Sequence, residues 1–320
     1  MSCYRTRFTL ILLFCTVLLA SCSSQTEINN NGNGSNNGGN GGSSGQFLFA
    51  GTAHAIFRST DSGATWSGMN AGPVQSVFGF AIYGNTIFAA TFGGILASND
   101  NGMTWALVGD SIGAFSIYRF GNYLIAGTDY GMRRSADGGK TWQGLSYASG
   151  VSAFASRGNE IIGACFYTGG GDLYKSTDSG ASWNQYTNGI NAEDLDAVAC
   201  DSLFYYAGSH REGAFRSSDR GQNWSTIDIN TPYVYAMLSN NGAVYAATDR
   251  AVMRTTDDGI VWQELGFPSA YSESSLLFNG QYLFCGTSGA GVFSSTDRGT
   301  TWKQVRTGLT DTVILSLGMK

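Results

Sequence analysis

One short motif recurs seven times along this chain and constrains its fold more than any other feature. The motif reads Ser/Thr-x-Asp-x-Gly-x-x-Trp, and its tryptophans are spaced 37 to 41 residues apart. All seven tryptophans of the chain belong to copies of the motif. A fixed period of this length indicates a repeat architecture, in which each unit buries its apolar face against its neighbours. The aspartates are Asp61, Asp100, Asp137, Asp178, Asp219, Asp257 and Asp297, and the tryptophans are Trp66, Trp105, Trp142, Trp183, Trp224, Trp262 and Trp302.

Each repeat contains four short segments typical of β-strands. In the second repeat they are residues 77–82, 86–90, 95–98 and 104–108, which we name strands a, b, c and d. A charged fraction of only 13% and 45 glycines suit short strands joined by tight turns. Four strands in about 40 residues, repeated seven times, predict an all-β fold: a single seven-bladed β-propeller with four-stranded blades.

The two ends of the repeat region predict how the ring closes. Residues 46–50 form a strand b that has no strand a before it, and residues 313–319 form a strand a that has no strand b after it. We therefore expect the C-terminal strand to pair into the first blade. Closure would remove two open sheet edges, which otherwise promote aggregation.

The chemistry of the repeated motif favours a structural role. In the turn between strands c and d, an Asp side chain accepts hydrogen bonds from backbone N–H groups ahead of it, and Gly supplies a positive φ. The Trp offers a large surface for packing between adjacent sheets. Because a functional site is local and asymmetric whereas this motif stands in every blade, we expect these residues to stabilise hairpins.

A basic residue precedes the motif in five of the seven repeats. We expect these side chains to be solvated charges on the rim, with an anionic partner as the alternative. They are Arg58, Arg134, Lys175, Arg216 and Arg254.

The N-terminus predicts export and lipidation. Arg5 and Arg7 precede an apolar run of 12 residues, 8–19, which as a helix would span about 18 Å and is too short for the roughly 30 Å hydrocarbon core. The run ends in Leu19-Ala20-Ser21-Cys22, which resembles the lipobox of bacterial lipoproteins. The resemblance implies a signal peptide over 1–21, a lipid on Cys22 and an anchor in the membrane of the cell envelope.

Residues 22–46 are predicted to follow as a tether, and residues 47–320 to form the propeller. The tether is almost entirely Ser, Asn and Gly, a composition typical of flexible linkers. Ser23 stands where inner-membrane lipoproteins usually carry Asp, so the resemblance favours the outer membrane. The propeller could lie on either the periplasmic or the surface side of that membrane.

Seven copies of the motif over 47–320 resemble the Asp-box (BNR-repeat) propeller superfamily. That superfamily includes sialidases, xyloglucan-active endoglucanases, the sortilin ectodomain and the photosystem II stability/assembly factor family, and the layout here is most similar to the last of these. The sialidase Arg-Ile-Pro or Arg-Leu-Pro motif is absent, since no Arg is followed by such a pair. The endoglucanases use two propellers, and one is expected here. No catalytic residue of either family therefore maps onto this chain.

A binding site is expected where the repeat varies, in the b–c and d–a loops at one end of the ring. The d–a loops would contribute Tyr186, Asn191, Glu193, Tyr233 and Tyr271. The residues proposed to bind a ligand from the b–c loops are Tyr130, Tyr167, His210, Arg211, Glu212, Asp249 and Arg250.

The functional hypothesis is a non-catalytic, envelope-anchored propeller that binds a protein or a glycan through these loops, for example as an assembly or interaction factor. The alternative is a glycoside hydrolase that uses Glu212 and Asp249 as its carboxylate pair. A net charge of −5 argues against a nucleic-acid partner. Two isolated histidines and no Cys-x-x-Cys argue against a metal site. We expect no cofactor and a monomer.

Overall fold

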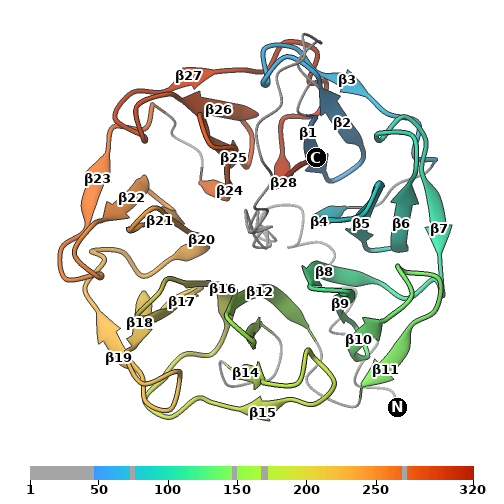
Figure 1. Cartoon of the computed structure of the whole chain (residues 1–320). Helices are drawn as coiled ribbons and strands as arrows, with labels where there is room; N and C mark the ends of the chain where they lie inside the picture. The colour runs from blue at the N-terminus through green and yellow to red at the C-terminus, as the bar shows by residue number, and fades with distance from the viewer. Residues whose placement is uncertain (1–46, 73–75, 146–149, 167–171, 269–271) are drawn as a thin grey trace, which may run out of the picture.

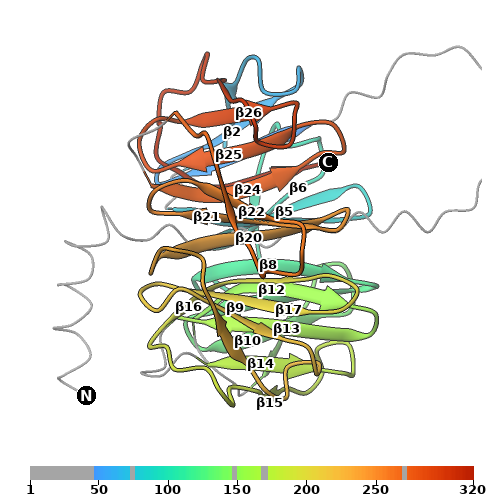
Figure 2. The same cartoon turned by 90° about the vertical axis from the view of Figure 1, so that its left-hand side faces the viewer.

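The computed structural model describes residues 47–72, 76–145, 150–166, 172–268 and 272–320. Seven four-stranded antiparallel sheets are arranged around a central axis as the blades of a propeller (Figure 1). Turned by 90°, the blades are seen from their edges, stacked across the ring (Figure 2). The prediction of a seven-bladed, all-β propeller is confirmed. Among the described residues there is no helix of the length and apolarity needed to cross a membrane.

Within each blade the strands follow the order a, b, c, d from the centre outwards (Figure 1). The a strands are β28 (Ile314–Met319), β4 (Val77–Tyr83), β8 (Ala114–Phe120), β12 (Val151–Arg157), β16 (Leu195–Cys200), β20 (Val234–Asn240) and β24 (Glu273–Phe278). The b strands are β1 (Leu48–Thr52), β5 (Thr86–Thr91), β9 (Tyr123–Thr128), β13 (Glu160–Cys165), β17 (Tyr205–Ser209), β21 (Ala243–Thr248) and β25 (Leu283–Thr287). The c strands are β2 (Ile56–Ser59), β6 (Gly94–Ser98), β10 (Gly131–Ser135), β14 (Leu173–Ser176), β18 (Ala214–Ser217), β22 (Val252–Thr255) and β26 (Val292–Ser295). The short d strands are β3 (Ser67–Gly68), β7 (Ala106–Val108), β11 (Gln143–Leu145), β15 (Asn184–Gln185), β19 (Ser225–Ile227), β23 (Gln263–Leu265) and β27 (Lys303–Gln304).

The ring closes between the two ends of the chain, as the sequence predicts. Strand β28 pairs antiparallel with β1, and the sheet order of the first blade is β28-β1-β2-β3. Phe47 and Lys320 extend this pairing, because each backbone N–H donates to the carbonyl of the other at 2.9 Å. The last strand of the chain is therefore the innermost strand of the first blade, and both edges of the open sheet are removed.

The small residues near the end of strand b allow the blades to approach one another closely. A Cβ atom on Gly127 would lie 2.3 Å from the carbonyl oxygen of Val151, the first residue of the next a strand. A Cβ on Gly208 would likewise lie 2.4 Å from Cγ1 of Val234. Since real Cβ atoms do not come this close to another heavy atom, Gly at these positions sets the spacing between adjacent sheets.

The motif between strands c and d forms a hydrogen-bonded turn. In the third blade, Asp137 accepts hydrogen bonds from the Ser135 hydroxyl at 2.8 Å and from the backbone N–H and hydroxyl of Thr141 at 2.9 and 2.6 Å. The Gly139 N–H donates to the Ser135 hydroxyl oxygen at 2.9 Å. The hydrogen bonds from Thr141 are the largest contribution holding the pKa of Asp137 at about 2. The turn needs two successive residues with positive φ, here Gly138 and Gly139.

The motif tryptophans pack between neighbouring blades. Trp105 contacts Phe49 of the preceding blade edge-to-face, with ring centroids 6.2 Å apart. Its indole N–H donates at 3.0 Å to the carbonyl of Gly102 in its own turn, and Trp142, Trp183 and Trp224 bond their own turns in the same way. The indole nitrogens of Trp262 and Trp302 are buried without a hydrogen-bond partner among the described residues.

Four of the basic residues before the motif, expected as solvated charges on the rim, also bond to the next blade, and one of them, Lys175, is buried. Each donates to a backbone carbonyl in the turn of the next blade, that of the residue immediately before the motif Gly. The reason is that this residue is left-handed in every such turn, so its carbonyl lies within reach of strand c of the preceding blade. The pairs are Arg58 with Asn101, Arg134 with Ser179, Lys175 with Arg220, and Arg216 with Asp258.

The fifth basic residue behaves differently. Arg254 donates to the Gln263 side chain of its own blade at 3.0 Å. The four interblade side chains also lie over aromatic rings, and the Arg134 guanidinium is 3.6 Å from the centroid of Tyr123. These four residues therefore link consecutive blades at their outer half.

Candidate functional site

The b–c and d–a loops lie together at one end of the ring, which we call the loop face. The a–b and c–d turns lie at the opposite end, which we call the turn face. Each a strand begins at the loop face with an irregularity in its pairing, a β-bulge, in all seven blades. Bulges redirect side chains and are frequent next to functional sites. The bulge residues, in blade order, are Leu315, Phe78, Phe115, Ser152, Asp196, Tyr235 and Ser274.

This ring of seven equivalent positions is chemically asymmetric. Blades one to three place Leu315, Phe78 and Phe115 there, whereas the remaining four blades place polar residues. Phe78 and Phe115 contact each other with centroids 5.7 Å apart, and Phe115 meets Phe166 edge-to-face at 5.1 Å. We call Phe78, Phe115 and Phe166 the phenylalanine cluster. It gives one side of the loop face an apolar character.

The fifth and sixth blades carry a polar and aromatic cluster at the same end. His210 Nδ1 lies 3.0 Å from Asp196 Oδ2, and side chains of both residues are mostly buried. The His210 ring contacts Tyr233 at 5.6 Å and Tyr235 at 5.8 Å, and the two tyrosine rings are stacked at 6.2 Å. We call Asp196, His210, Tyr233 and Tyr235 the tyrosine–histidine cluster.

The electrostatics of this cluster follow from its burial and its pairing. The hydrogen bond to Asp196 raises the pKa of His210 above its usual range. Burial, followed by the negative charge of Asp249, raises the pKa of Tyr235 to about 12. Burial also raises the pKa of Asp194, which precedes the cluster in the chain. The site therefore holds carboxylates in a half-buried setting, where their charge acts strongly on a ligand.

Charged residues of the b–c loops surround the cluster. The Thr231 hydroxyl donates to Asp249 Oδ1, and Arg250 Nε is 3.9 Å from Asp249 Oδ2. Arg211 and Glu193 form an exposed pair at 3.9 Å. Five of the loop residues predicted to bind a ligand thus belong to two adjacent blades. They are His210, Arg211, Glu212, Asp249 and Arg250.

One of the predicted ligand-binding residues lies elsewhere, and another is outside the described residues. Tyr130 is on the third blade, separated from the fifth by the whole of the fourth, and is 81% exposed. Tyr167 lies outside the described residues, as do Tyr271 and Cys22. The second histidine of the loop face, His54, pairs with Asp311 at 3.1 Å on the first blade.

The carboxylates of the hydrolase hypothesis have different surroundings. Glu212 Oε2 is buried and has no hydrogen-bond partner among the described residues, whereas Asp249 is held by Thr231. In the part of the chain that the structure describes, no group of three or more His, Cys, Asp or Glu side chains has the arrangement of a metal site.

Sequence reasoning missed Asp196, Tyr235, Phe78 and Phe115. They occupy the second position of strand a, where the sequence looks like ordinary strand. Alignment of the seven repeats gives a signal, since this position reads Leu, Phe, Phe, Ser, Asp, Tyr, Ser and the inward neighbours on both sides are small or aliphatic in most blades.

A cavity of about 760 Å³ opens at the turn face, opposite to the predicted binding loops. It is lined by the a–b turns and the ends of the a strands in the third to seventh blades. Its walls include Phe154, Arg157, Asp201, Met237 and Asn240.

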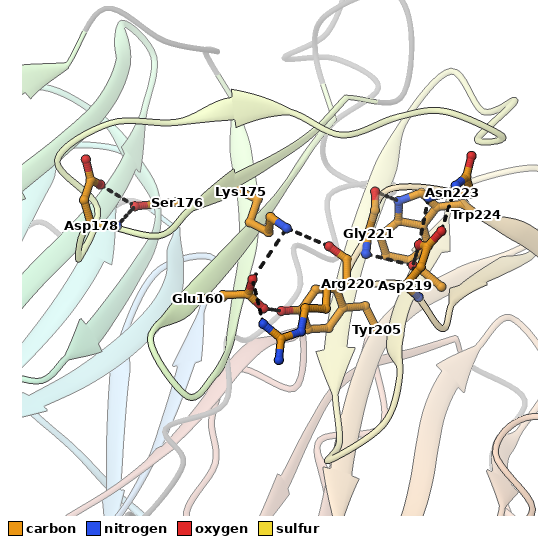
Figure 3. Close-up of polar contacts among 11 residues, drawn as sticks. Glu160, Lys175, Ser176, Asp178, Tyr205, Asp219, Arg220, Gly221, Asn223 and Trp224 are labelled. Carbon is orange, nitrogen blue, oxygen red and sulfur yellow. Dashed lines mark hydrogen bonds and ion pairs between the residues drawn. The ribbon is translucent and has the colours of Figure 1, made fainter.

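A buried ionic cluster lies near that cavity, between the fourth and fifth blades (Figure 3). Glu160 is 7% exposed and accepts a hydrogen bond from the Tyr205 hydroxyl. Lys175 Nζ is 3.6 Å and an Arg220 nitrogen 3.9 Å from Glu160 Oε1. Burial, together with the bond to Glu160, raises the pKa of Tyr205. Because the carboxylate is paired and shielded, the cluster joins two blades and offers no accessible reactive group.

Comparisons with known proteins support the architecture. The family model of the DUF6242 beta propeller domain matches residues 182–314. No curated protein matches the chain. Among solved structures, YCF48 from Cyanidioschyzon merolae is 16% identical with a TM-score of 0.59, covering 72% of this chain and 85% of that one.

Two further structures are similar. YCF48 bound to D1 peptide is 18% identical with a TM-score of 0.56, covering 71% of this chain and 79% of that one. The extracellular domain of a hybrid two-component system from B. thetaiotaomicron is 15% identical with a TM-score of 0.65, covering 78% of this chain but only 36% of that one. At these identities the likeness establishes the propeller fold.

Proposed function

We propose that this protein is a non-catalytic scaffold that binds a protein partner through its loop face. The observation that carries the proposal is the asymmetry of that face. The seven blades repeat the same turns, tryptophans and bulges, yet the bulge positions change from Phe78 and Phe115 to Asp196 and Tyr235. Since every blade could carry the same residue at this position without loss of stability, the change of side chain from blade to blade favours a recognition role.

The two ends of the described chain lie at the face opposite to the proposed binding loops. Phe47 and Lys320 pair at the turn face, at the end of the ring opposite to the b–c loops. A tether over 22–46, anchored by a lipid on Cys22, would leave from that end. Since the linker is flexible, it would not fix the orientation of the ring, but it would leave the loop face free for a partner in the cell envelope.

The fold comparisons agree with a binding role. One propeller of the same fold has been solved with a bound peptide, and another lies within the extracellular domain of a hybrid two-component system. A glycan remains the second ligand class, because stacked tyrosines such as Tyr233 and Tyr235 also suit sugar rings. The hydrolase alternative has less support, because Glu212 Oε2 is buried and Asp249 is hydrogen-bonded by Thr231.

The test is capture of partners from envelope extract by the full chain. His210→Ala should lose the captured protein, whereas His54→Ala, a histidine of the same face in another blade, should retain it. Equal capture by both variants, at equal melting temperature, would contradict binding at the fifth and sixth blades. A captured partner that is released by glycosidase treatment would assign a glycan ligand instead.

A further inference from the structure

We infer that the loop face recognises a peptide segment in which a Lys or Arg side chain stands close to an apolar side chain. The inference rests on the proposed function and names the chemistry of the partner. It follows from two adjoining surfaces, the tyrosine–histidine cluster on the fifth and sixth blades and the phenylalanine cluster on the second to fourth.

Acidic groups outnumber basic groups around the tyrosine–histidine cluster. The carboxylates are those of Asp194, Asp196, Glu212 and Asp249, with Glu193 at the exposed edge. The cations are Arg211, which pairs with Glu193, and Arg250, which lies beside Asp249. His210 is engaged by Asp196. The remaining negative charge is half-buried, so it attracts a cation more strongly than solvated carboxylates would.

The aromatic side chains of the cluster suit the same ligand. Tyr233 and Tyr235 are nearly parallel, with an interplanar angle of 18°. The faces of tyrosine rings attract ammonium and guanidinium groups, and neighbouring carboxylates accept their N–H donors. An anionic ligand, such as a phospholipid headgroup or a phosphorylated residue, would meet like charge here.

One buried acceptor in these loops has no donor within the described chain. Glu212 Oε2 is shielded from solvent and has no hydrogen-bond partner among the described residues. Leaving a buried acceptor without a donor is unfavourable. Glu212 lies two residues after His210 in the same b–c loop, so its carboxylate adds negative charge to the site, and it would accept an N–H group of a bound ligand only after its side chain turns outward.

The phenylalanine cluster explains why the ligand is a peptide rather than a free amine. Phe115 and Phe166 are partly exposed, and Phe92 of the second b–c loop is 36% exposed. The fourth blade, which carries Phe166, is next to the fifth, which carries His210. An apolar side chain would pack on the phenylalanines while a basic side chain enters the tyrosine–histidine cluster, and a peptide supplies both.

The experiment is selection of a random heptapeptide library on the immobilised full chain, followed by affinity measurement with labelled peptides. We expect enriched peptides to pair Lys or Arg with an aromatic or branched aliphatic residue. Replacing that Lys or Arg by Gln should weaken binding at least about tenfold, equivalent to 1.4 kcal/mol. Free lysine and a polyamine should bind far more weakly than the peptide.

Variants of the protein separate this inference from the proposed function. Asp249→Asn and Tyr233→Ala should each weaken peptide binding about tenfold, and His54→Ala should leave it unchanged. Peptides without a basic residue that still require Tyr233 would overturn the inference and leave the loop face as the binding surface. Peptides insensitive to every loop-face variant, with melting temperatures unchanged, would overturn both. Tyr233→Phe keeps the aromatic ring and serves as the control for a folding defect in Tyr233→Ala.

Discussion

Removal of one interblade link should destabilise the propeller measurably, and Arg134→Met is the sharpest case. Arg134 Nε donates to the Ser179 carbonyl of the next blade at 2.9 Å, and its guanidinium lies 3.6 Å from the centroid of Tyr123. A hydrogen bond from a charged donor contributes about 1.5–3 kcal/mol, and a partly exposed cation–π contact about 0.5–1 kcal/mol. Methionine keeps much of the apolar stem. Because Arg134 is half-buried, we expect a loss of about 1.5–2.5 kcal/mol in the free energy of unfolding.

The repeat supplies a matched control for this measurement. Arg254 stands at the same position of the sixth blade, yet it donates to Gln263 within its own sheet. Arg254→Met should therefore cost less than about 0.5 kcal/mol, as for most exposed substitutions. The assay is urea unfolding followed by tryptophan fluorescence, with the midpoint and slope fitted for both variants. Equal losses in the two variants would refute the role of the interblade link.

Three further predictions concern the ring and its turns. Deletion of residues 311–320 removes β28 from the first blade and should lower the melting temperature by at least about 10 °C, because an innermost strand is lost; an unchanged melting curve would disprove closure. Trp142→Ala should cost about 3–5 kcal/mol in unfolding free energy without changing ligand preference, and selective loss of binding at full stability would contradict the structural role of the motif. The lowered pKa of Asp137, about 2 against an ordinary 3.8, means that its contribution to stability is complete above about pH 4 and is lost as the pH falls towards 2; melting scans should show this fall, and Asp137→Asn should reduce it.

Much of the fold could be predicted because it depends on residues that are close in sequence and recur in every repeat. The tryptophans count the blades, and the unpaired strands at 46–50 and 313–319 give the closure. The turn network of Asp137 follows from Asp and Gly in the motif, although the need for a second left-handed residue, such as Asn101 before Gly102, was not visible. That residue varies among the repeats, so no single letter marks it.

The site was only partly predictable, because its residues meet through the ring and not along the chain. The b–c loops gave His210 and Asp249 as variable loop residues. Asp196 and Tyr235 lie inside strands and face the loops only because a bulge redirects each a strand at its start. The pairing of Arg134 with Ser179 also depends on the distance between blades, which cannot be predicted from the sequence.

Site-specific photo-crosslinking tests the central claim, binding at the loop face, most directly. Arg250 and Ile260 belong to the same blade and have similar exposure, 65% for the Arg250 side chain and 70% for Ile260, but they lie at opposite ends of the ring. A photoreactive amino acid at each position, in the full chain within cells, reports which face meets the partner. We predict a specific crosslinked protein from position 250 and none from position 260. Crosslinking from position 260 alone would place the partner at the turn face and contradict the account.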